Sequence, residues 1–429
     1  MKYKWLFISL VISLVFVGTI TVSASEYKSE VSVGLKYGTS AGNSVTVSSS
    51  SGVNVLDAVT GAIIYTSLPD EKIDIQMGST GFAAFDKFDA SGISRISVQS
   101  LGENIVECDG TKYRGYIYVE RRSNGELLVI NYVGTDDYVS SVLGKEMNYT
   151  WPKEALKAQA VCARNFVLTR GNAHKEYGFD VCKTTHCQVY GGIPSEHENT
   201  RQAVEETKGV LAKYNGKLVG LYFFATSGGQ TEDVENVWGS EYGYLKSVED
   251  TYENPEKASR YTWTAKFTKE EIEEKLINYG ADIGSLEKIT IDSTSDSGRV
   301  TKMTFHGSKD DYCVKLEKCR TILGLYSQKF TVSSDSVSTL STTSGTASAP
   351  YYAMTSNGVG GIAGFSVING QNKIETMEIN ESEAHNYVIN GGGYGHGVGM
   401  SQWGARGMAE NGFTYDQILM HYFTDIELE

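Results

Sequence analysis

Residues 391–405 of the chain read GGGYGHGVGMSQWGA, and six of the first nine are glycine. Such runs occur where the backbone needs a positive φ or must pass close to another group. The run is not a dinucleotide-binding fingerprint, because Met400 stands where the pattern G-x-G-x-x-G, counted from Gly395, requires its last glycine. It also lacks a Walker lysine. Composition alone leaves two alternatives open: tight turns in which His396 packs against Trp403, or a loop that lines a substrate site.

The segments that precede this run alternate between strand and helix signals. Short β-like bursts separated by Gly, Ser and Asn turns fill residues 27–120. The clearest helix is WPKEALKAQAVCARNFVLTRG (151–171), which has Pro152 in its first turn and Gly171 as a stop. Asn215-Gly216 predicts a hairpin turn. Further helices are predicted in the ranges 195–209, 268–280 and 415–423.

These signals predict an α+β fold that is rich in β-structure, with a few helices around a central cleft. The glycine run follows a Ser/Thr-dominated segment, TVSSDSVSTLSTTSGTASAP (331–350), which we interpret as a surface loop or linker. We therefore expect a discontinuous catalytic core that the C-terminal glycine run closes. The expected divisions are a signal segment (1–25), a β-rich region (26–120), the first part of the core (121–265), an inserted region (266–384) and the C-terminal part of the core (385–429).

The N-terminus predicts export. Two lysines precede an apolar run from Leu6 to Val17, and Val22-Ser23-Ala24 resembles a signal-peptidase site. We expect an extracytoplasmic protein, secreted or associated with the cell surface, and a membrane contact only if this segment stays uncleaved. The net charge is −14 and no block of basic residues stands out, which argues against a nucleic-acid partner.

Cysteine and histidine gather in VCKTTHCQVY (181–190). Cys182, His186 and Cys187 offer two thiolates and an imidazole, and His174 precedes them by eight residues. Four nitrogen and sulfur donors are what a closed tetrahedral zinc site needs. The spacing alone leaves a Cys182–Cys187 disulfide or free thiols as alternatives, and it gives no pairing rule for the remaining cysteines.

A candidate acid lies between a helical segment and the Pro-initiated 151–171 helix. Glu146 stands beside Met147, Tyr149 and Trp151, where partial desolvation would raise its pKa as a general acid requires. Other glutamates compete for this role, namely Glu103, Glu126 and Glu154.

Residues 223–250, FFATSGGQTEDVENVWGSEYGYLKSVED, are dense in hydroxyl groups and aromatic rings. Ser227 does not lie in a G-x-S-x-G motif, so a serine hydrolase is not indicated. Hydroxyl, Tyr and Trp groups on loops suit a carbohydrate ligand.

Four segments together resemble one family of bacterial cell-wall proteins. They are LGKEM…WPKEALKAQAVCAR, CKTTHCQVYGG, SGGQTEDVENVWGSEYGYLKSVED and GGGYGHGVGMSQWGARGMAENG. In this order they resemble the SpoIID/LytB family, which includes sporulation protein D and amidase enhancers. The last motif is very specific to the family. The likeness spans about 110–255, 295–330 and 385–427.

The resemblance implies a peptidoglycan lytic transglycosylase, a carbon–oxygen lyase that acts on glycan strands stripped of their stem peptides. Such enzymes cleave the bond between N-acetylmuramic acid and N-acetylglucosamine without water and leave a 1,6-anhydro ring. A single carboxylic acid first protonates the glycosidic oxygen and then takes the proton of the 6-hydroxyl as that group attacks C1. The resemblance assigns this role to Glu146, and it explains why no second acid is required nearby.

The resemblance also implies roles for other residues. Arg164 should position Glu146 or a substrate oxygen. Residues expected to contact the sugar or to line its cleft are His186, Thr231, Tyr244, Lys246, Ser227, His396, Ser401 and Gln402. Some members of the family hold zinc near the cleft, and the matching donors here are His174, Cys182, His186 and Cys187. If His186 binds zinc, it organises the cleft instead of acting as a free acid or base.

Two other functions compete with the transglycosylase. One is a non-enzymatic protein of the same fold that binds the cell wall or enhances an amidase. The other is a zinc hydrolase, which a full set of two cysteines and two histidines argues against because catalytic zinc needs an open position. We expect peptidoglycan as substrate, a cell-wall amidase as partner and no organic cofactor. The glycine run would form the C-terminal wall of the cleft, where a sugar chain can approach the backbone.

Overall fold

The computed structural model describes residues 28–84, 86–171, 173–335 and 385–429, together with the backbone of seven short strands between 338 and 381. The predicted signal segment, 1–25, lies outside the described residues. Among the described residues, no helix combines the length and the apolar character that a membrane span requires.

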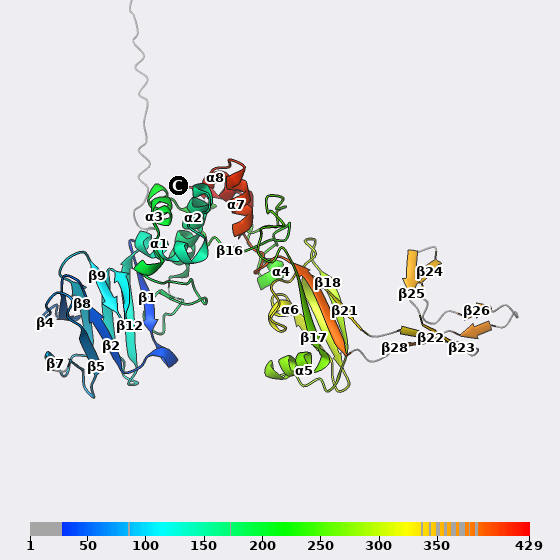
Figure 1. Ribbon diagram of the computed structural model, residues 1–429, viewed down its shortest axis with the longest axis horizontal. Coiled ribbons are helices and arrows are strands. Elements are labelled where there is room, and N and C mark those ends of the chain that lie inside the picture. The colour runs from blue at the N-terminus through cyan, green and yellow to red at the C-terminus, as the bar shows by residue number, and fades with distance from the viewer. Residues whose placement is uncertain are drawn as a thin grey trace, which may run out of the picture.

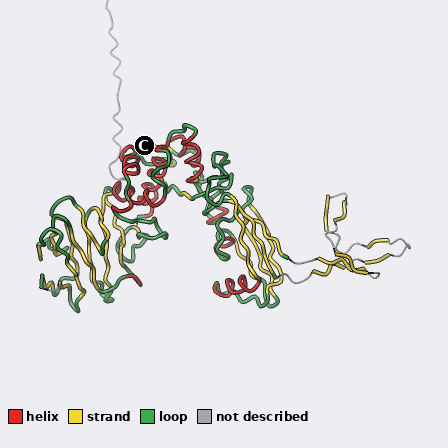
Figure 2. The backbone as a smooth tube through the Cα atoms, viewed as in Figure 1, coloured by secondary structure: helices red, strands yellow, loops and turns green. Residues whose placement is uncertain are grey.

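Two hydrophobic cores divide the chain into two bodies. The first body has a core drawn from residues 31–245 and 398–426, and the second body has a core drawn from residues 263–389. Figure 1 shows the first body in blue to green with the red C-terminal helices, and the second body in green to orange. In both bodies strand residues outnumber helical residues, and helices accompany the sheets, as the predicted α+β class requires (Figure 2).

Two sheets build the β-rich part of the first body. The seven-stranded sheet has the order β13-β1-β12-β11-β8-β3-β4, and the six-stranded sheet has the order β10-β9-β2-β5-β6-β7. The strands of the first sheet are β1 (Glu30–Lys36), β3 (Val53–Asp57), β4 (Ile63–Thr66), β8 (Arg95–Ser100), β11 (Tyr116–Arg121), β12 (Leu127–Gly134) and β13 (Val181–Cys182). Those of the second are β2 (Ser44–Ser48), β5 (Ile73–Met77), β6 (Phe82–Ala84), β7 (Phe88–Ala90), β9 (Ile105–Cys108) and β10 (Thr111–Arg114). A short 3₁₀ turn, η1 (Gly38–Ser40), follows β1.

Alternation of apolar and polar residues explains these strands. In β5, Ile73 and Ile75 are buried, whereas Asp74 and Gln76 between and after them are exposed. Because successive side chains of a strand point to opposite faces, this pattern buries one face of the sheet in the core and leaves the other in water.

Helices of the first body gather at one end of its sheets (Figure 1). They are α1 (Thr135–Glu146), α2 (Lys153–Arg170), α3 (Glu198–Glu206), α7 (Gln402–Glu410) and α8 (Tyr415–Tyr422), with the 3₁₀ turn η2 (Ile193–Ser195). The predicted helix 151–171 is α2, with Pro152 as its N-cap and Gly171 as its C-cap. The predicted helices in 195–209 and 415–423 are α3 and α8, whereas α7 was not predicted.

Short strands complete the first body. The predicted hairpin joins β14 (Ala212–Tyr214) to β15 (Lys217–Leu218), and its turn residues Asn215 and Gly216 have φ of 53° and 72°. Positive φ at both positions is the signature of a type I′ turn. Strand β31 (Glu427–Leu428) extends this sheet, and β16 (Phe223–Phe224) pairs in parallel with β30 (Met400–Ser401).

The second body contains two three-stranded sheets, ordered β17-β29-β21 and β18-β19-β20. Its strands are β17 (Thr262–Thr268), β18 (Leu286–Thr294), β19 (Val300–Gly307), β20 (Tyr312–Lys315), β21 (Phe330–Ser334) and β29 (Asn386–Gly392). Helix α5 (Lys269–Asn278) confirms the prediction in 268–280, and α6 (Lys318–Thr321) is a single turn. The single turn α4 (Glu235–Trp238) packs on the core of the first body. Strand β29 packs on the core of the second body. The expected division assigns its residues instead to the C-terminal part of the catalytic core (385–429).

The Ser/Thr-rich segment 331–350 was wrongly predicted to be a loop. Strand β21 takes its first residues into a sheet beside β29, where Val332 alternates with polar neighbours. The seven strands that follow are β22 (Ser338–Thr342), β23 (Gly345–Ser348), β24 (Tyr352–Thr355), β25 (Gly358–Gly361), β26 (Ser366–Ile368), β27 (Ile374–Thr376) and β28 (Glu378–Glu381). Low hydrophobicity misled the prediction, because in β21 only Phe330 and Val332 pack on the core while the other residues of the strand stay exposed.

Candidate functional site

Glu146 is the last residue of α1, and its side chain lines a pocket of about 320 Å³. The other lining residues come from three separate segments of the first body and the glycine run. They are Phe166, Thr185, Cys187, Gln188, Val189, Tyr222, Phe223 and His396. Among the described residues that line this pocket, Glu146 is the single carboxylate.

The environment of Glu146 favours its protonated form. Burial raises the pKa of Glu146, and hydrogen bonds from the Gln402 side chain and the Val189 backbone only partly oppose this rise. Desolvation disfavours the charged form of a carboxyl group, as a general acid near neutral pH requires. The expectation of a partly desolvated Glu146 is therefore confirmed, while its catalytic role stays a prediction.

The pairing of β30 with β16 brings the C-terminal motif close to Glu146. Because β30 pairs with β16, residues 400–402 lie beside residues 223–224. Gln402, the first residue of α7, bonds to Glu146 and also donates from Nε2 to Gln159 Oε1 at 3.4 Å. The glycine run therefore folds back onto the region of Glu146, as the discontinuous core predicts.

His396 lines the pocket, but its ring nitrogens are bound within the protein. Its Nδ1 accepts the backbone N–H of Val398 at 3.1 Å, and the ring bonds to the Phe223 backbone. Burial, aided by the positive charge of Arg320, lowers the pKa of His396 to about 3. The ring packs against Phe224 and Trp238, with centroids 5.5 and 5.2 Å away, and not against Trp403 as one alternative proposed. His396 is therefore a neutral brace of the pocket wall.

The glycines of the run are required by close packing within the protein. At Gly397, φ is 87°, and a Cβ would lie 2.8 Å from Arg299 Nε of the second body. At Gly399, φ is 78°, and a Cβ would overlap the carbonyl oxygen of Tyr222. Packing within the protein therefore accounts for glycine at both positions, and the expectation that the run admits a sugar chain stays a prediction.

Arg164 does not contact Glu146. Its guanidinium is fully buried and donates to Asp136 Oδ1 at 2.9 Å, near the N-terminus of α1, whereas Glu146 ends that helix. It also donates to the carbonyl groups of Val204 and Val210 at 3.3 and 3.4 Å. Arg164 can thus influence Glu146 only by fixing the position of α1.

Four further residues expected to bind sugar lie away from this pocket. Thr231 and Ser227 are fully buried, and their hydroxyl oxygens accept the backbone N–H groups of Val248 at 2.8 Å and Gly229 at 3.0 Å. The buried Tyr244 hydroxyl donates to the Gly220 carbonyl at 2.9 Å. In this conformation none of the three can face a sugar. Lys246, which pairs with Glu241 at 3.0 Å, is partly exposed and outside the pocket lining.

Ser401 bonds to Glu253, which forms with Asp250 a buried acidic pair that the sequence did not predict. Its hydroxyl caps α7 by accepting the Gly404 N–H at 3.1 Å and donates to Glu253 Oε1 at 2.5 Å. Glu253 also accepts the Ser227 N–H at 2.6 Å. Burial and the adjacent charge of Glu253 raise the pKa of Asp250 to about 7. Ser401 is therefore a structural residue that anchors α7, not a ligand contact.

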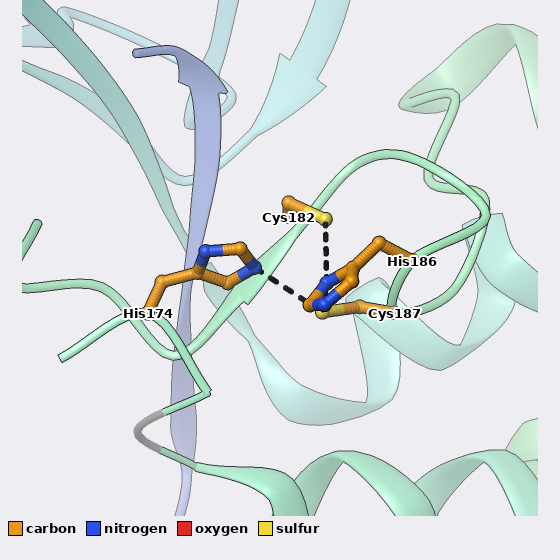
Figure 3. A group of neighbouring side chains, drawn as sticks. All are labelled: His174, Cys182, His186 and Cys187. Carbon is orange, nitrogen blue, oxygen red and sulfur yellow. Dashed lines mark hydrogen bonds between the residues drawn. The ribbon is translucent and has the colours of Figure 1, made fainter. Parts of the chain in front are cut away.

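The four predicted metal donors converge on one point. Ligand atoms of His174, Cys182, His186 and Cys187 all lie within 4.8 Å of one another (Figure 3). His186 Nδ1 is 3.8 Å from Cys182 Sγ and 3.4 Å from Cys187 Sγ, so the adjacent pair does reach the same point. His174 Nε2 is 3.5 Å from Cys187 Sγ. All six cysteines, each within the described residues, are free thiols, which disfavours the disulfide alternative.

The two thiols of this cluster differ in acidity. Burial opposes ionisation of Cys182, but hydrogen bonds with Thr184, Tyr37 and His186 outweigh it and lower the pKa of Cys182 to about 5. Burial and the charge of Cys182 raise the pKa of Cys187 to about 11. A second thiolate beside the first needs a positive charge to offset repulsion, which a divalent cation supplies. The donor number, type and spacing fit a metal ion.

The same loop supplies pocket residues that were not predicted. Gln188 follows Cys187 directly, and both line the pocket with Glu146. Thr185, between Cys182 and His186 in the chain, also lines the pocket. Their only sequence signal is their position inside the CKTTHCQVY motif, because a lone Gln or Thr carries no chemical pattern.

Two family profiles match this chain, one in each body. A family profile described as "Stage II sporulation protein" matches residues 123–214, which contain Glu146 and the four donors. A second profile, described as "Domain of unknown function (DUF8618)", matches residues 245–361, largely in the second body.

Individual relatives extend over more of the chain. An uncharacterised protein of Brachyspira hyodysenteriae is 32% identical over 310 residues, which cover 71% of this chain and 69% of that protein. The amidase enhancer of Bacillus subtilis is 31% identical over 306 residues, covering 66% of this chain but only 39% of the relative. Stage II sporulation protein D of Bacillus subtilis is 25% identical over 314 residues, covering 68% of this chain and 74% of the relative.

The matched profile and relatives define a class of bacterial proteins that includes stage II sporulation protein D and the amidase enhancer. The chain belongs to the SpoIID/LytB family.

Proposed function

We propose that this chain is a peptidoglycan lytic transglycosylase that cleaves peptide-stripped glycan strands to 1,6-anhydro products. The observation that carries the proposal is the single carboxylate, Glu146, in a partly enclosed pocket where burial raises its pKa. Glycoside hydrolases generally need two carboxylates flanking the scissile bond. A lone carboxyl group suits intramolecular attack, because the substrate supplies its own nucleophile.

The proposed reaction uses one proton carrier twice. Protonated Glu146 donates to the glycosidic oxygen, and the bond between that oxygen and C1 of N-acetylmuramic acid breaks. The muramoyl 6-hydroxyl attacks C1, and the Glu146 carboxylate takes the hydroxyl proton. Glu146 returns to its protonated form, and no water is consumed. Gln402, which bonds to Glu146, would hold the carboxyl group in position through both steps.

We propose zinc as the metal held by His174, Cys182, His186 and Cys187. Two thiolates and two imidazoles are a common structural zinc set. A closed set supplies a structural crosslink, and in this chain it would fix the loop that carries Cys187 and Gln188 into the pocket. His186 would then organise the pocket and would not act as an acid or base. No step of the proposed reaction passes through the metal.

The cellular setting is also a proposal. The N-terminal segment favours export, and peptidoglycan lies outside the cytoplasmic membrane. The likeness to an amidase enhancer favours cooperation with a cell-wall amidase, since the glycan substrate must first lose its stem peptides.

A non-enzymatic role is the second candidate. It is favoured by the burial of Ser227, Thr231 and Tyr244, which removes three expected sugar contacts from the pocket. In that case the fold would bind the wall or an amidase without cleaving glycan. The likeness to an amidase enhancer is compatible with this candidate as well.

Product analysis in heavy-oxygen water separates these functions. Purified protein is incubated with peptide-free glycan strands, and the fragments are examined by mass spectrometry. Anhydro ends without incorporated heavy oxygen support the transglycosylase. Reducing ends that carry heavy oxygen mean hydrolysis. Intact strands together with measurable binding would refute the enzyme and favour the non-enzymatic protein.

A further inference from the structure

One buried hydrogen-bond donor in the pocket has no function in the proposed reaction. Gln188 is 2% exposed and lines the pocket with Glu146. Its Oε1 accepts the Tyr138 hydroxyl at 3.1 Å, which fixes the orientation of the side-chain amide. Among the described residues, Gln188 Nε2 has no hydrogen-bond partner. Buried amide groups in native proteins nearly always have partners, so this donor points to a missing acceptor.

The remaining lining limits what that acceptor can be. Phe166, Tyr222 and Phe223 give part of the pocket aromatic walls. Polar side chains of Glu146, Thr185 and His396 line the rest of the pocket, so Gln188 lies between a polar and an aromatic part of the wall. A ligand group that presents an acceptor oxygen and a small apolar end meets both requirements. The acetamido group of an N-acetylated sugar has a carbonyl oxygen and a methyl group, whereas a ring hydroxyl lacks the apolar end.

We propose that Gln188 is a specificity-determining residue that donates from Nε2 to the acetamido carbonyl of an N-acetylated sugar bound beside Glu146. The inference rests on the proposed function, because it places a glycan in the pocket. The methyl group of the acetamido would pack on the aromatic wall. Tyr138 acts as a positioning residue, since its hydroxyl holds the oxygen of the Gln188 amide and turns the N–H groups toward the ligand.

The energetic consequence is a preference for acetylated glycan. Leaving a buried donor without its acceptor lowers affinity by about tenfold to a hundredfold. Wild-type protein should therefore bind de-N-acetylated strands at least about tenfold more weakly than acetylated strands. Replacing Gln188 with leucine removes the donor, so the penalty for losing the acetyl group should largely disappear.

The test measures binding without turnover. Glu146→Gln protein is titrated with peptide-free glycan strands and with the same strands after chemical de-N-acetylation, and the ratio of the two Kd values is the readout. Adding Gln188→Leu should reduce that ratio from about tenfold or more to about twofold. Gln328→Leu is the matched control, because Gln328 is equally buried but lies in the second body, where its Nε2 donates to Val300 O at 3.0 Å.

Each outcome decides the inference. An unchanged ratio in Gln188→Leu, an equal loss of affinity for both strands, or no binding of either strand by the parent protein would overturn it. If Gln188→Leu does not fold, Tyr138→Phe replaces it and should reduce the ratio by about threefold or more through loss of amide orientation; an unchanged ratio in that variant would also overturn it. Selective binding without any cleavage by the wild type would refute the proposed enzyme and leave the role of Gln188 supported.

Discussion

The buried Asp250 carboxyl group should make stability depend on pH in a way that one substitution removes. Burial, reinforced by the charge of Glu253, raises the pKa of Asp250 from 3.8 to about 7. The folded protein therefore holds this proton at pH values where the unfolded chain has lost it. The resulting stabilisation is fully present below the unfolded pKa and is lost as pH rises through the folded pKa.

The magnitude follows from the size of the shift. A rise of about three pKa units corresponds to about 4 kcal/mol, and between pH 4.5 and pH 8.5 about 3 kcal/mol of it should disappear. Asp250→Asn keeps the size of the side chain and remains neutral throughout. The variant should match the wild type near pH 4.5 and exceed its free energy of unfolding by about 3 kcal/mol near pH 8.5.

Urea denaturation at several pH values between 4.5 and 8.5 measures this difference. Groups that do not interact with Asp250 titrate equally in the two proteins, so their contributions cancel. Asp70→Asn is the control, because the Asp70 side chain is exposed and is not part of the Asp250–Glu253 pair. A wild-type minus variant difference that stays constant within about 1 kcal/mol across this range would refute the assignment of a raised pKa to Asp250.

Three further perturbations have defined outcomes. Gln402→Leu removes a hydrogen bond that lowers the pKa of Glu146, so the alkaline limb of the pH–activity profile should move up by about one unit. Cys182→Ser removes one of the four donors, so bound zinc measured by metal analysis should fall from about one ion per chain to well below half. Gly399→Ala should lower the free energy of unfolding by about 3 kcal/mol through strain and overlap with backbone, whereas Gly412→Ala, which has open space, should lose only about 1 kcal/mol.

Opposite results would contradict each argument separately. An alkaline limb that stays in place would mean that Gln402 does not act on the catalytic carboxyl group. Full zinc content after loss of the Cys182 thiol would place the metal elsewhere. Equal effects of the two glycine substitutions would show that backbone strain alone, without close packing, explains Gly399.

Local elements were predictable because their signals lie within a few residues. Pro152 and Gly171 mark the ends of α2, and Asn215-Gly216 marks the hairpin turn. Helix α7 escaped prediction because glycine weakens a helix in isolation. Its Gly407 is required by a distant neighbour, since a Cβ there would overlap the Tyr252 carbonyl.

The candidate site was predictable only in part. The metal donors lie close together in sequence, so their spacing indicated a cluster that the structure does form. The expected fold-back of the glycine run onto the region of Glu146 is present, but the motifs did not show that Arg164 pairs with Asp136 at the other end of α1. Burial of Thr231 could not be predicted either, because it depends on how distant segments pack.

The central claim is that Glu146 alone carries the proton transfers of glycan cleavage. The most direct measurement compares wild type, Glu146→Gln and the control Glu154→Gln on peptide-free glycan strands, with the ends of the products identified by mass spectrometry. Glu154 pairs with Lys157 at 3.0 Å and lies outside the pocket lining. The proposal predicts anhydro-ended fragments from the wild type and Glu154→Gln, and a loss of at least about a thousandfold in rate for Glu146→Gln. Cleavage by Glu146→Gln at a rate close to that of the wild type would contradict it.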